Sequence, residues 1–512
     1  MSIFSKIALY LVLITTFCTS CQSDAQPDIQ NVVLLIGDDH STRALACYGN
    51  KIIQTPNIDR LAEDGTVFMN AYANAPICNA SRQSLLTGKY PHSTGVTLLS
   101  TPFQDETNKT IAEYLRDHGY STGVIGKTHF NNRGKDKPDH GFSVMIGDKE
   151  YKSWLKSQNM PQISDSIRVL TEWRPFVDSA RIWLNADVLP TAIHEQFGSA
   201  AFDAAKAIEF LQQNKDTAFF LCVGFHEPHA PFHFPLEFAG KYDPAEMPMP
   251  KGSSEDDRFV PEIFRDLSED DKRGIVASYY TSVEYMDQNV GKILDEIDRL
   301  GLAENTLVIY LGDQGYLLGD HKRFEKHTMW DPAIKAPLIF RLGSSVKGSE
   351  RTKALVQFID VVPTILDIVG LPPLESVQGR SMKYLFGLKN AAGNDYVLAE
   401  FPLDDMAMIT DGKWKYIYTT GLYDLGQGYA TGYGPTGTLH RLYDLQNDPE
   451  ESSNIADFPG NETILKSLQE HMLNIFRETH PEASKISDTL SLEKQLADFC
   501  KPYDKGASRG NR

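Results

Sequence analysis

Four short apolar segments, each of which stops at a glycine followed by polar or charged side chains, constrain the fold of this 512-residue chain most strongly. They cover residues 31–36, 122–125, 218–223 and 306–311. A continuous apolar run of this length is typical of a strand that is buried on both faces of a parallel sheet. Amphipathic helical patterns separate these segments, at residues 56–64, 110–118, 200–213 and 271–300. The alternation predicts an α/β fold with a doubly wound sheet.

A second, smaller unit follows this main body. A further strand at 337–340 and a helix at 359–369 complete the main body, and the Gly-Leu-Pro-Pro sequence at 370–373 marks a boundary. Hairpin strands are indicated at 406–409, 414–418 and 442–444, and an amphipathic helix at 464–476. We therefore expect a main domain over 29–370, a smaller α+β subdomain with an antiparallel sheet over 371–490, and a tail over 491–512 whose last dozen residues are frayed.

The N-terminus has the pattern of an export signal. Lys6 precedes an apolar run at residues 7–17, which is too short to remain as a membrane-spanning helix. Cys21 follows two small residues, as at a bacterial lipoprotein processing site, where it would carry a lipid anchor. The alternative is ordinary cleavage near residue 25. Residues 1–20 are thus a predicted signal peptide, and we expect the mature protein in the periplasm or on the surface of a bacterium.

The overall charge excludes one class of partner. Lys and Arg number 50 and Asp and Glu number 68, which gives a formal net charge of -18. A surface of this sign repels polyanions at long range, so general binding of nucleic acids is disfavoured.

The cysteines indicate a reactive thiol rather than a disulfide framework. Six cysteines in a chain of this length do not form such a framework. The sequence does not decide whether a disulfide joins any two of Cys47, Cys222 and Cys500. Cys222 lies in an apolar run and is expected to be a small buried hydrophobe. Cys78 lies instead among small polar residues with Arg82 four positions later, which makes it a candidate reactive thiol.

Carboxylates and an amide follow two of the predicted strands. Asp38 and Asp39 come after the first strand, and Asp313 and Gln314 come after the strand at 306–311. Active sites of open α/β sheets lie at the carboxyl ends of the strands, where these side chains would meet. Hard oxygen donors suit Ca²⁺, and less well Mg²⁺, so the sequence predicts a divalent-cation site.

Basic side chains follow the same strand ends. The set comprises Lys127, His129, His226, His229, Arg323, Lys326 and His327. A divalent cation surrounded by lysine, arginine and histidine is suited to a tetrahedral oxyanion, because fixed positive charge stabilises the charge that develops during displacement. Histidine also serves as an acid or a base near neutral pH.

In the residues described so far and in the motifs below, the chain resembles the formylglycine-dependent sulfatases over residues 31 to about 455. The most specific match is CNASR at residues 78–82 followed by LTG at 86–88, which fits the C-x-[PA]-S-R signature of that family. Supporting motifs occur in the same order along the chain: GDD at 37–39, TPNID at 55–59, GKTH at 126–129, HEPHAP at 226–231, GDQG at 312–315 and KH at 326–327.

The resemblance implies an alkaline-phosphatase-like fold, with a mixed sheet, and a maturation step. A formylglycine-generating enzyme or a radical maturase would oxidise Cys78 to formylglycine. The hydrated aldehyde offers one hydroxyl for attack on sulfur and a second for release, whereas a thiol would be trapped as a stable ester. The family usually has asparagine or histidine where this chain has Gln314, but the amide oxygen keeps Gln314 in the expected ligand set.

The resemblance also implies roles for the site residues. Arg82 and Lys127 would hold the sulfate and the formylglycine in line, His229 and Lys326 would bind the sulfate and protonate the leaving oxygen, and His129 would deprotonate the second hydroxyl. The metal ligands would be Asp38, Asp39, Cys78, Asp313 and Gln314. Residues that would contact substrate outside the chemistry are His226, Arg323 and His327.

The expected substrate is a sulfated oligosaccharide from a polysaccharide such as ulvan, carrageenan, fucoidan or a glycosaminoglycan, because the histidine motifs look like those of iduronate sulfatases and sulfamidases. One alternative is hydrolysis of phosphonates or phosphodiesters, or of the N-sulfate of glucosamine. A non-enzymatic alternative is a protein that binds sulfated glycans with Cys78 unconverted.

Overall fold

A mixed sheet of eight strands forms the centre of the molecule, in the order β4-β3-β5-β1-β6-β7-β2-β8. The computed structural model describes residues 29–131, 139–171, 174–175, 177–343, 350–388, 391–421, 430–434 and 436–504. The strands are β1 (Asn31–Gly37), β2 (Thr66–Tyr72), β3 (Ser121–Gly126), β4 (Val144–Ile146), β5 (Phe219–Gly224), β6 (Thr306–Gly312), β7 (Leu338–Leu342) and β8 (Glu350–Gln357). The four predicted apolar strands are confirmed as β1, β3, β5 and β6, which are mutually parallel neighbours.

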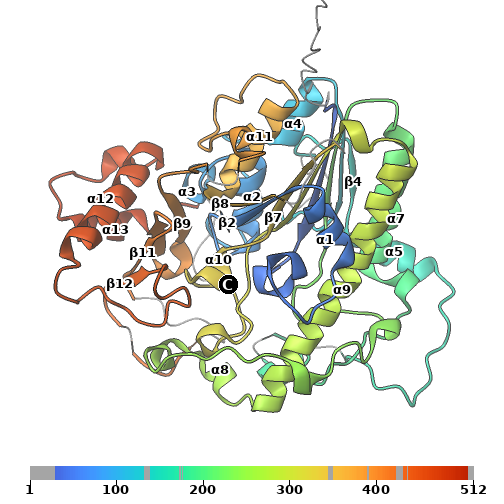
Figure 1. Ribbon diagram of the computed structural model, residues 1–512, viewed down its shortest axis with the longest axis horizontal. Helices are drawn as coiled ribbons and strands as arrows, with labels where there is room; N and C mark the ends of the chain where they lie inside the picture. Colours follow the sequence, from blue (N-terminus) through green and yellow to red (C-terminus); the bar gives the residue numbers. More distant parts are fainter. Residues whose placement is uncertain are drawn as a thin grey trace, which may run out of the picture.

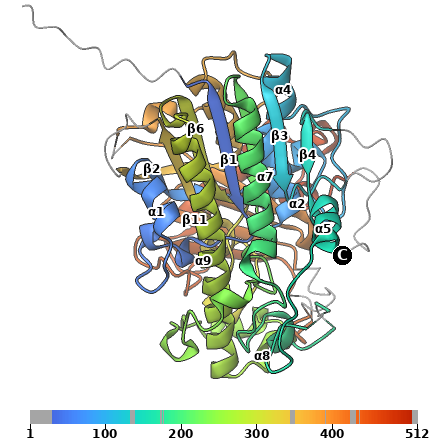
Figure 2. The same ribbon diagram turned by 90° about the vertical axis from the view of Figure 1, so that its right-hand side faces the viewer.

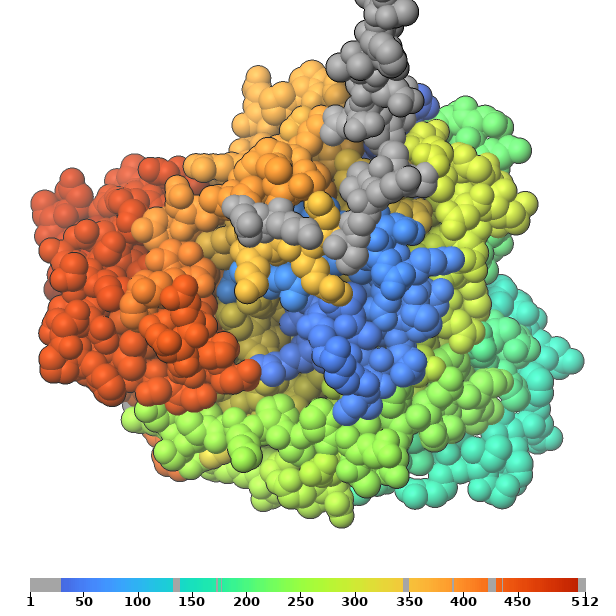
Figure 3. Space-filling model, in the orientation of Figure 1, coloured from blue at the N-terminus to red at the C-terminus, as the bar shows by residue number. Residues whose placement is uncertain are grey.

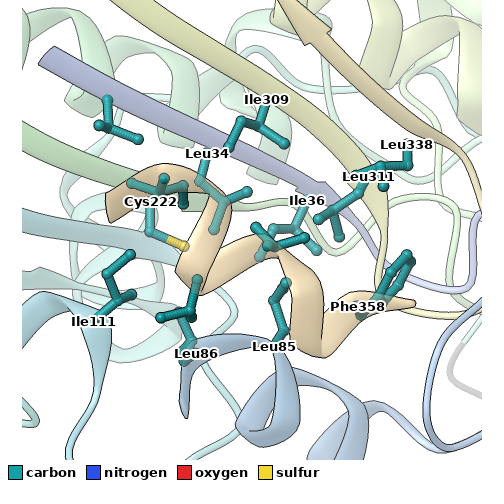
Figure 4. Close-up of a cluster of buried hydrophobic side chains, with 14 of the residues drawn as sticks. Leu34, Ile36, Leu85, Leu86, Ile111, Cys222, Ile309, Leu311, Leu338 and Phe358 are labelled. Atoms are coloured by element: carbon teal, nitrogen blue, oxygen red, sulfur yellow. The ribbon is translucent and has the colours of Figure 1, made fainter. Parts of the chain in front are cut away.

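Helices cover both faces of this sheet, which confirms the doubly wound α/β prediction (Figures 1 and 2). One layer contains α1 (Pro56–Glu63), α7 (Ser199–Asn214) and α9 (Glu269–Arg299), and the other contains α2 (Cys78–Thr87), α4 (Ile111–Asp117) and α11 (Val361–Ile368). Val33 and Leu35 of β1 belong to the core under the first layer, whereas Leu34 and Ile36 belong to the core under the second. Figure 4 shows Leu34 and Ile36 above the side chains of α2. This alternation is the two-residue period of a strand that is buried on both faces.

Shorter helices lie in the connections between these elements. They are α3 (Pro91–Thr94), α5 (Asp148–Ser157), α6 (Ala180–Trp183), α8 (Glu262–Arg265) and α10 (Asp331–Ile334). The segment from 313 to 330, between β6 and α10, extends beyond the carboxyl end of β6 and carries several of the predicted site residues.

A second sheet of four antiparallel strands forms the C-terminal unit, as the hairpin pattern predicted. Its order is β12-β11-β10-β9, with β9 (Val397–Phe401), β10 (Met406–Thr410), β11 (Trp414–Thr419) and β12 (Leu439–Asp444). Helices α12 (Glu462–Thr479) and α13 (Leu492–Phe499) pack on this sheet through a shared apolar core. Figure 3 shows this unit, in orange to red, packed against the main body.

The chain end is ordered further than the sequence predicted. Residues 492–499 form α13, whose Phe499 stacks on Phe476 of α12 with ring centroids 5.4 Å apart. Cys500 is fully buried, and the Asp504 carboxylate accepts hydrogen bonds from the main-chain N–H groups of Thr97 and Leu98 at 2.8 and 2.9 Å. The prediction that the chain beyond residue 490 is a tail outside the C-terminal unit is therefore wrong for residues 492–504, because a short apolar helix face closes the core of that unit.

The cysteines of the described residues are all unpaired. Cys47, Cys78, Cys222 and Cys500 are free and buried, so no disulfide links Cys47, Cys222 and Cys500. The predicted signal peptide and Cys21 lie outside the described residues. Within the described part of the chain, no helix is both long and apolar enough to span a bilayer.

His480, at the C-terminal end of α12, gives the C-terminal unit a defined pH response. Its side chain is 7% exposed, stacks on His92, and accepts a hydrogen bond at Nδ1 from the Glu482 N–H at 3.0 Å. Burial, helped by His92 and opposed by Glu400 and Glu482, lowers the pKa of His480 to about 4. In the unfolded chain the pKa returns to about 6.5. Between pH 4 and pH 6.5, His480 therefore binds a proton less readily in the folded state than in the unfolded chain.

We expect the free energy of unfolding to fall as the pH drops from 6.5 toward 4, by about 1–2 kcal/mol at pH 5 from this group. In His480→Gln the amide oxygen still accepts from Glu482, but the side chain takes up no proton. Urea titrations at pH 7 and pH 5 should show a smaller loss in the variant than in the wild type. An equal loss in both proteins would contradict the role of His480.

Candidate active site

The carboxyl ends of β1 and β6 bring the predicted oxygen donors together. Gly37 and Gly312 are register partners in these two parallel strands, so the residues that follow them emerge at the same edge of the sheet. Asp38, Asp39, Asp313 and Gln314 are all at most 1% exposed. The Asp39 N–H donates to Asp313 Oδ1 at 2.9 Å, which joins the two strand ends directly.

Cys78 approaches this edge from α2, which covers one face of the sheet. It is the first residue of α2 and is 2% exposed. One ligand atom from each of Asp38, Cys78 and Asp313 lies within 4.8 Å of the other two. We call these three residues the acidic cluster. The structure therefore brings the candidate reactive thiol and two of the predicted metal ligands to one point.

Two lysines approach the thiol from separate segments. Lys127 Nζ lies 3.7 Å from Cys78 Sγ and contacts the Asp38 carboxylate. Lys326 Nζ lies 3.8 Å from the same sulfur and contacts the Asp39 carboxylate. Both ammonium groups are thus fixed next to the reacting position by buried carboxylates.

Arg82 fixes the third carboxylate. Its Nε donates to Asp313 Oδ2 at 2.7 Å and its Nη1 donates to the Lys127 carbonyl oxygen at 2.8 Å. Since Cys78 and Arg82 lie four residues apart on α2, one turn of the helix presents the thiol and the guanidinium to the same site. Three cations therefore face three buried carboxylates, which offsets much of the cost of burying these charges.

The electrostatic environment affects the protonation of the cluster. Burial by itself raises the pKa of Asp38, but the charges of Lys127, Arg82 and Lys326 outweigh it and hold that pKa well below its usual value. Burial also raises the pKa of the Cys78 thiol, although the two lysines oppose this shift. The thiol is therefore kept neutral while Asp38 is kept as a carboxylate.

Two histidines lie at the rim of the cluster. His229 Nε2 is 3.7 Å from Asp39 Oδ2, and its Nδ1–H donates to the Ala230 carbonyl oxygen at 2.8 Å. His129 has a left-handed φ of 60°, and its buried Nδ1 has no hydrogen-bond partner among the described residues. Burial and then Lys127 lower the pKa of His129 to about 2. Burial also lowers the pKa of His229, so both imidazoles are neutral at neutral pH.

The donor set fits a hard divalent cation. Asp38 Oδ1 and Gln314 Oε1 are buried oxygens without a hydrogen-bond donor among the described residues, and Gln314 Nε2 donates to Asp39 Oδ1. Unpaired buried oxygens are costly unless a cation or an unseen donor satisfies them. The Gln314 amide oxygen has no hydrogen-bond donor among the described residues, and its role as a metal ligand stays a prediction.

Three predicted substrate contacts lie outside the acidic cluster and have other partners. His226 Nε2 lies 2.8 Å from an Asp148 carboxylate oxygen on α5, and His327 stacks on Phe401 of β9 at 5.3 Å. Arg323 forms an ion pair with Glu325, and its guanidinium lies 5.7 Å from the Trp330 ring centroid. None of these contacts is with the acidic cluster, so these residues surround the site rather than form it.

Two residues that position the site were not singled out by their sequence. Ser81 donates its hydroxyl to the main-chain oxygen of Asp313, and Tyr279 of α9 donates to the main-chain oxygen of Asp39. The Tyr279 oxygen also accepts from the Ser41 N–H at 2.8 Å. Ser81 could have been identified from the sequence, because it lies within the CNASR motif. A tyrosine on the buried face of a long helix gives no comparable signal.

Two protein-family models match the chain. The family model described as Sulfatase matches residues 30–371, and the model described as N-sulphoglucosamine sulphohydrolase, C-terminal, matches residues 319–478. An N-acetylglucosamine-6-O-sulfatase of Bacteroides thetaiotaomicron is 24% identical over 93% of this chain and 92% of its own length. Human iduronate 2-sulfatase is 29% identical over 68% of this chain and 67% of its own.

Solved structures support the fold. A phosphonate monoester hydrolase of Agrobacterium radiobacter superposes with a TM-score of 0.74 at 21% identity, covering 90% of this chain and 98% of that one. A protein solved in complex with its substrate D-glucosamine-2-N,6-O-disulfate gives a TM-score of 0.68 at 21% identity, with 89% and 98% covered.

Proposed function

Since the chain belongs to the sulfatase family, we propose that it hydrolyses sulfate esters of a sulfated polysaccharide or of its oligosaccharides. The proposal includes a formylglycine at position 78 and Ca²⁺ at the acidic cluster. The observation that carries it is the position of Cys78 Sγ, which two ammonium groups approach at 3.7 and 3.8 Å beside two buried carboxylates. This arrangement is suited to a nucleophile that attacks a tetrahedral oxyanion.

Two groups absent from the chain as translated would complete the chemistry. A hydrated formylglycine at position 78 supplies one hydroxyl for attack on sulfur and a second for release of the product. Ca²⁺ supplies positive charge that favours the deprotonated form of that hydroxyl. The residues that would hold the ion are Asp38, Asp39, Asp313 and Gln314 together with the modified residue 78.

The side chains of the protein would position the sulfate and move protons. Lys127 and Lys326 would bind the sulfate oxygens, because both ammonium groups already lie within 4 Å of the reacting position. Arg82 would keep residue 78 in line through its contacts with Asp313 and the Lys127 carbonyl. His229 Nε2, which carries no proton when Nδ1–H donates to Ala230, would take up the proton that the attacking hydroxyl loses and deliver it to the leaving sugar oxygen. The neutral imidazole of His129 would accept the proton of the second hydroxyl.

The assignment to glycans is supported by the relatives. The similar curated proteins include enzymes named for 6-O-sulfated N-acetylglucosamine and for iduronate 2-sulfate. The test is release of inorganic sulfate from defined tetrasaccharides of heparin, chondroitin sulfate, carrageenan, fucoidan and ulvan, with an aryl sulfate and a matched phosphonate ester alongside. Hydrolysis of only the aryl sulfate would overturn the glycan assignment, and faster hydrolysis of the phosphonate would overturn the sulfatase reaction.

A second candidate is hydrolysis of an N-sulfate on glucosamine. The match of residues 319–478 to the C-terminal model of N-sulphoglucosamine sulphohydrolase favours it, because that segment includes Lys326, His327 and the C-terminal sheet. Two monosaccharides, glucosamine 6-sulfate and N-sulfoglucosamine, separate the two reactions, since each carries a single sulfate.

Removal of the metal ion is expected to abolish activity and lower stability together. Dialysis against a chelator should eliminate sulfate release, and Ca²⁺ should restore it. Because an ion that binds only the folded state stabilises by about 2.7 kcal/mol at 100 times its Kd, the melting temperature of the wild type should rise on addition of Ca²⁺.

Asp313→Asn should lose this rise in melting temperature, because it removes one of the three buried carboxylates. Asp498→Asn, which alters an exposed carboxylate on α13, should keep the rise. A full thermal shift in Asp313→Asn would contradict the assignment of the ion to the acidic cluster.

A further inference from the structure

A cavity apart from the acidic cluster lies between α8, the start of α9 and the segment from 315 to 325. Its volume is about 830 Å³, within the range of small-molecule sites. Its lining includes five cationic side chains, Lys251, Arg265, Lys272, Arg273 and Lys322, against two carboxylates, Asp257 and Glu269. This is a local excess of positive charge in a chain whose formal net charge is -18. We call it the basic cavity.

Much of the positive charge in the basic cavity is not neutralised by neighbours. Lys322 pairs with Asp257, and Lys272 lies 3.5 Å from Glu269. Within the described part of the chain, Lys251, Arg265 and Arg273 form no ion pair with a carboxylate. Such cations provide charge-assisted donors for an anion that enters the cavity.

An aromatic ring completes the wall. The Arg265 guanidinium lies 5.1 Å from the ring centroid of Tyr433, which is 49% exposed. Arg265 also donates to the Val260 carbonyl oxygen at 2.9 Å and to that of Thr431, so its position is fixed by main-chain contacts. A fixed guanidinium beside an exposed tyrosine offers both charge for an anionic substituent and an apolar face for a sugar ring.

One hairpin of the chain links the basic cavity to Lys326 of the active site. The N–H groups of Leu317 and Gly319 donate to the carbonyl oxygens of Glu325 and Arg323, so residues 317–325 form a hairpin. The tip of this hairpin lines the cavity through Gly319 and Lys322, and Lys326 follows its base. Four residues span at most about 14 Å, which is the upper limit for the distance from Lys322 to Lys326 along the chain. Figure 2 shows α8 below the carboxyl ends of the parallel strands, on the side of the active site.

We propose that the basic cavity binds an anionic substituent on a second sugar residue of the substrate, a few units from the sulfate that is hydrolysed. The inference rests on the proposed glycan sulfatase function and deepens it. The enzyme would thus act on oligosaccharides with at least two anionic groups in preference to single sulfated sugars. The anion is a sulfate ester or a uronic acid carboxylate, since both accept charge-assisted hydrogen bonds.

The test compares binding and turnover in three proteins. Lys251→Ala with Arg265→Gln removes two cations from the basic cavity, and Lys466→Ala with Lys494→Ala removes two exposed cations from the C-terminal helices. Both double variants change the net charge equally. Binding of the five tetrasaccharides is measured by calorimetry in a Cys78→Ala background. The cavity variant should bind the preferred tetrasaccharide about 10-fold to 100-fold more weakly, while the helix variant should bind like its parent.

Turnover provides the second readout. The ratio of kcat/KM for the tetrasaccharide to kcat/KM for the matching monosaccharide sulfate should fall by about 10-fold or more in the cavity variant. A desulfated tetrasaccharide that keeps its carboxylates, used as a competitor, identifies the anion: competition assigns the carboxylate, and its absence assigns the sulfate. Tyr433→Leu, which keeps all cations, should weaken tetrasaccharide binding by a smaller factor.

Two results would overturn the inference. One is equal tetrasaccharide affinity in the cavity and helix variants. The other is a kcat/KM ratio that does not change. Failure of the proposed function looks different, because wild-type protein would then release no sulfate from any glycan or monosaccharide in the panel.

Discussion

Replacement of Cys78 by alanine is expected to abolish sulfate release, with a loss in kcat of about 10⁵-fold or more, as for removal of a catalytic nucleophile. The variant loses both the nucleophile and the atom that completes the acidic cluster with Asp38 and Asp313. It should still fold, because the change removes one buried sulfur and leaves a small cavity that costs about 1 kcal/mol. Sulfate release and urea unfolding, measured on the same preparation, check both parts.

The matched control is Cys222→Ala, which removes a buried thiol of β5 in the main sheet. It should retain its activity, since Cys222 packs in the apolar core under α2. Mass spectrometry of the wild-type Cys78 peptide completes the test. Formylglycine shows an exchange of sulfur for oxygen and the loss of two hydrogens. Full activity in Cys78→Ala would refute the mechanism, and an unmodified peptide in active enzyme would refute the formylglycine.

Replacement of Lys415 by methionine is expected to lower the free energy of unfolding by about 3–5 kcal/mol. Lys415 of β11 is completely buried, and its Nζ lies 2.8 Å from Asp331 Oδ1 and 2.7 Å from Glu451 Oε1. Without it, the buried Glu451 carboxylate has no ion-pair partner among the described residues, and Asp331 keeps only Lys335 at 3.5 Å. The loss should shrink as the pH falls, because protonation of these carboxylates removes the uncompensated charge.

Urea titration of Lys415→Met beside Lys413→Met, an exposed lysine in the same hairpin, measures the effect. The triple variant with Asp331→Asn and Glu451→Gln should recover part of the loss, since it removes the unpaired charges. Unchanged unfolding midpoints in Lys415→Met would contradict the prediction. Because Asp331 begins α10 five residues after Lys326, we also expect a lower kcat in Lys415→Met through displacement of that lysine.

The sequence predicted the centre of the fold well because the centre is made of simple patterns. β1 and β6 are continuous apolar runs, and their glycines place Asp38 and Asp313 directly after the strand ends. Parallel strands that are neighbours in one sheet must deliver such residues to one edge. The acidic cluster therefore follows from the strand pattern together with the CNASR motif.

The remaining parts depend on contacts between distant segments. The pairing of Lys127 with Asp38 and of Lys326 with Asp39 joins residues that are 89 and 287 positions apart, and no local pattern encodes such a choice. The ion pair of Arg323 with Glu325 and its position over the Trp330 ring are also not predictable from the sequence, and its role as a substrate contact stays a prediction. α13 was missed because eight residues carry little periodic signal, and only the core of the C-terminal unit shows why they are helical.

The order of the strands also determines how much of the chain must be synthesised before Cys78 can be enclosed. β1 lies between β5 and β6, and α2 packs against the 3₁₀ turn at Phe358–Asp360 and against α11. Cys78 therefore cannot be enclosed until the chain has been made beyond residue 306. At about 5–20 residues per second, the intervening stretch takes roughly 10–50 s to synthesise. During this interval the proposed modifying enzyme would have access to position 78 before the core that encloses α2 is complete.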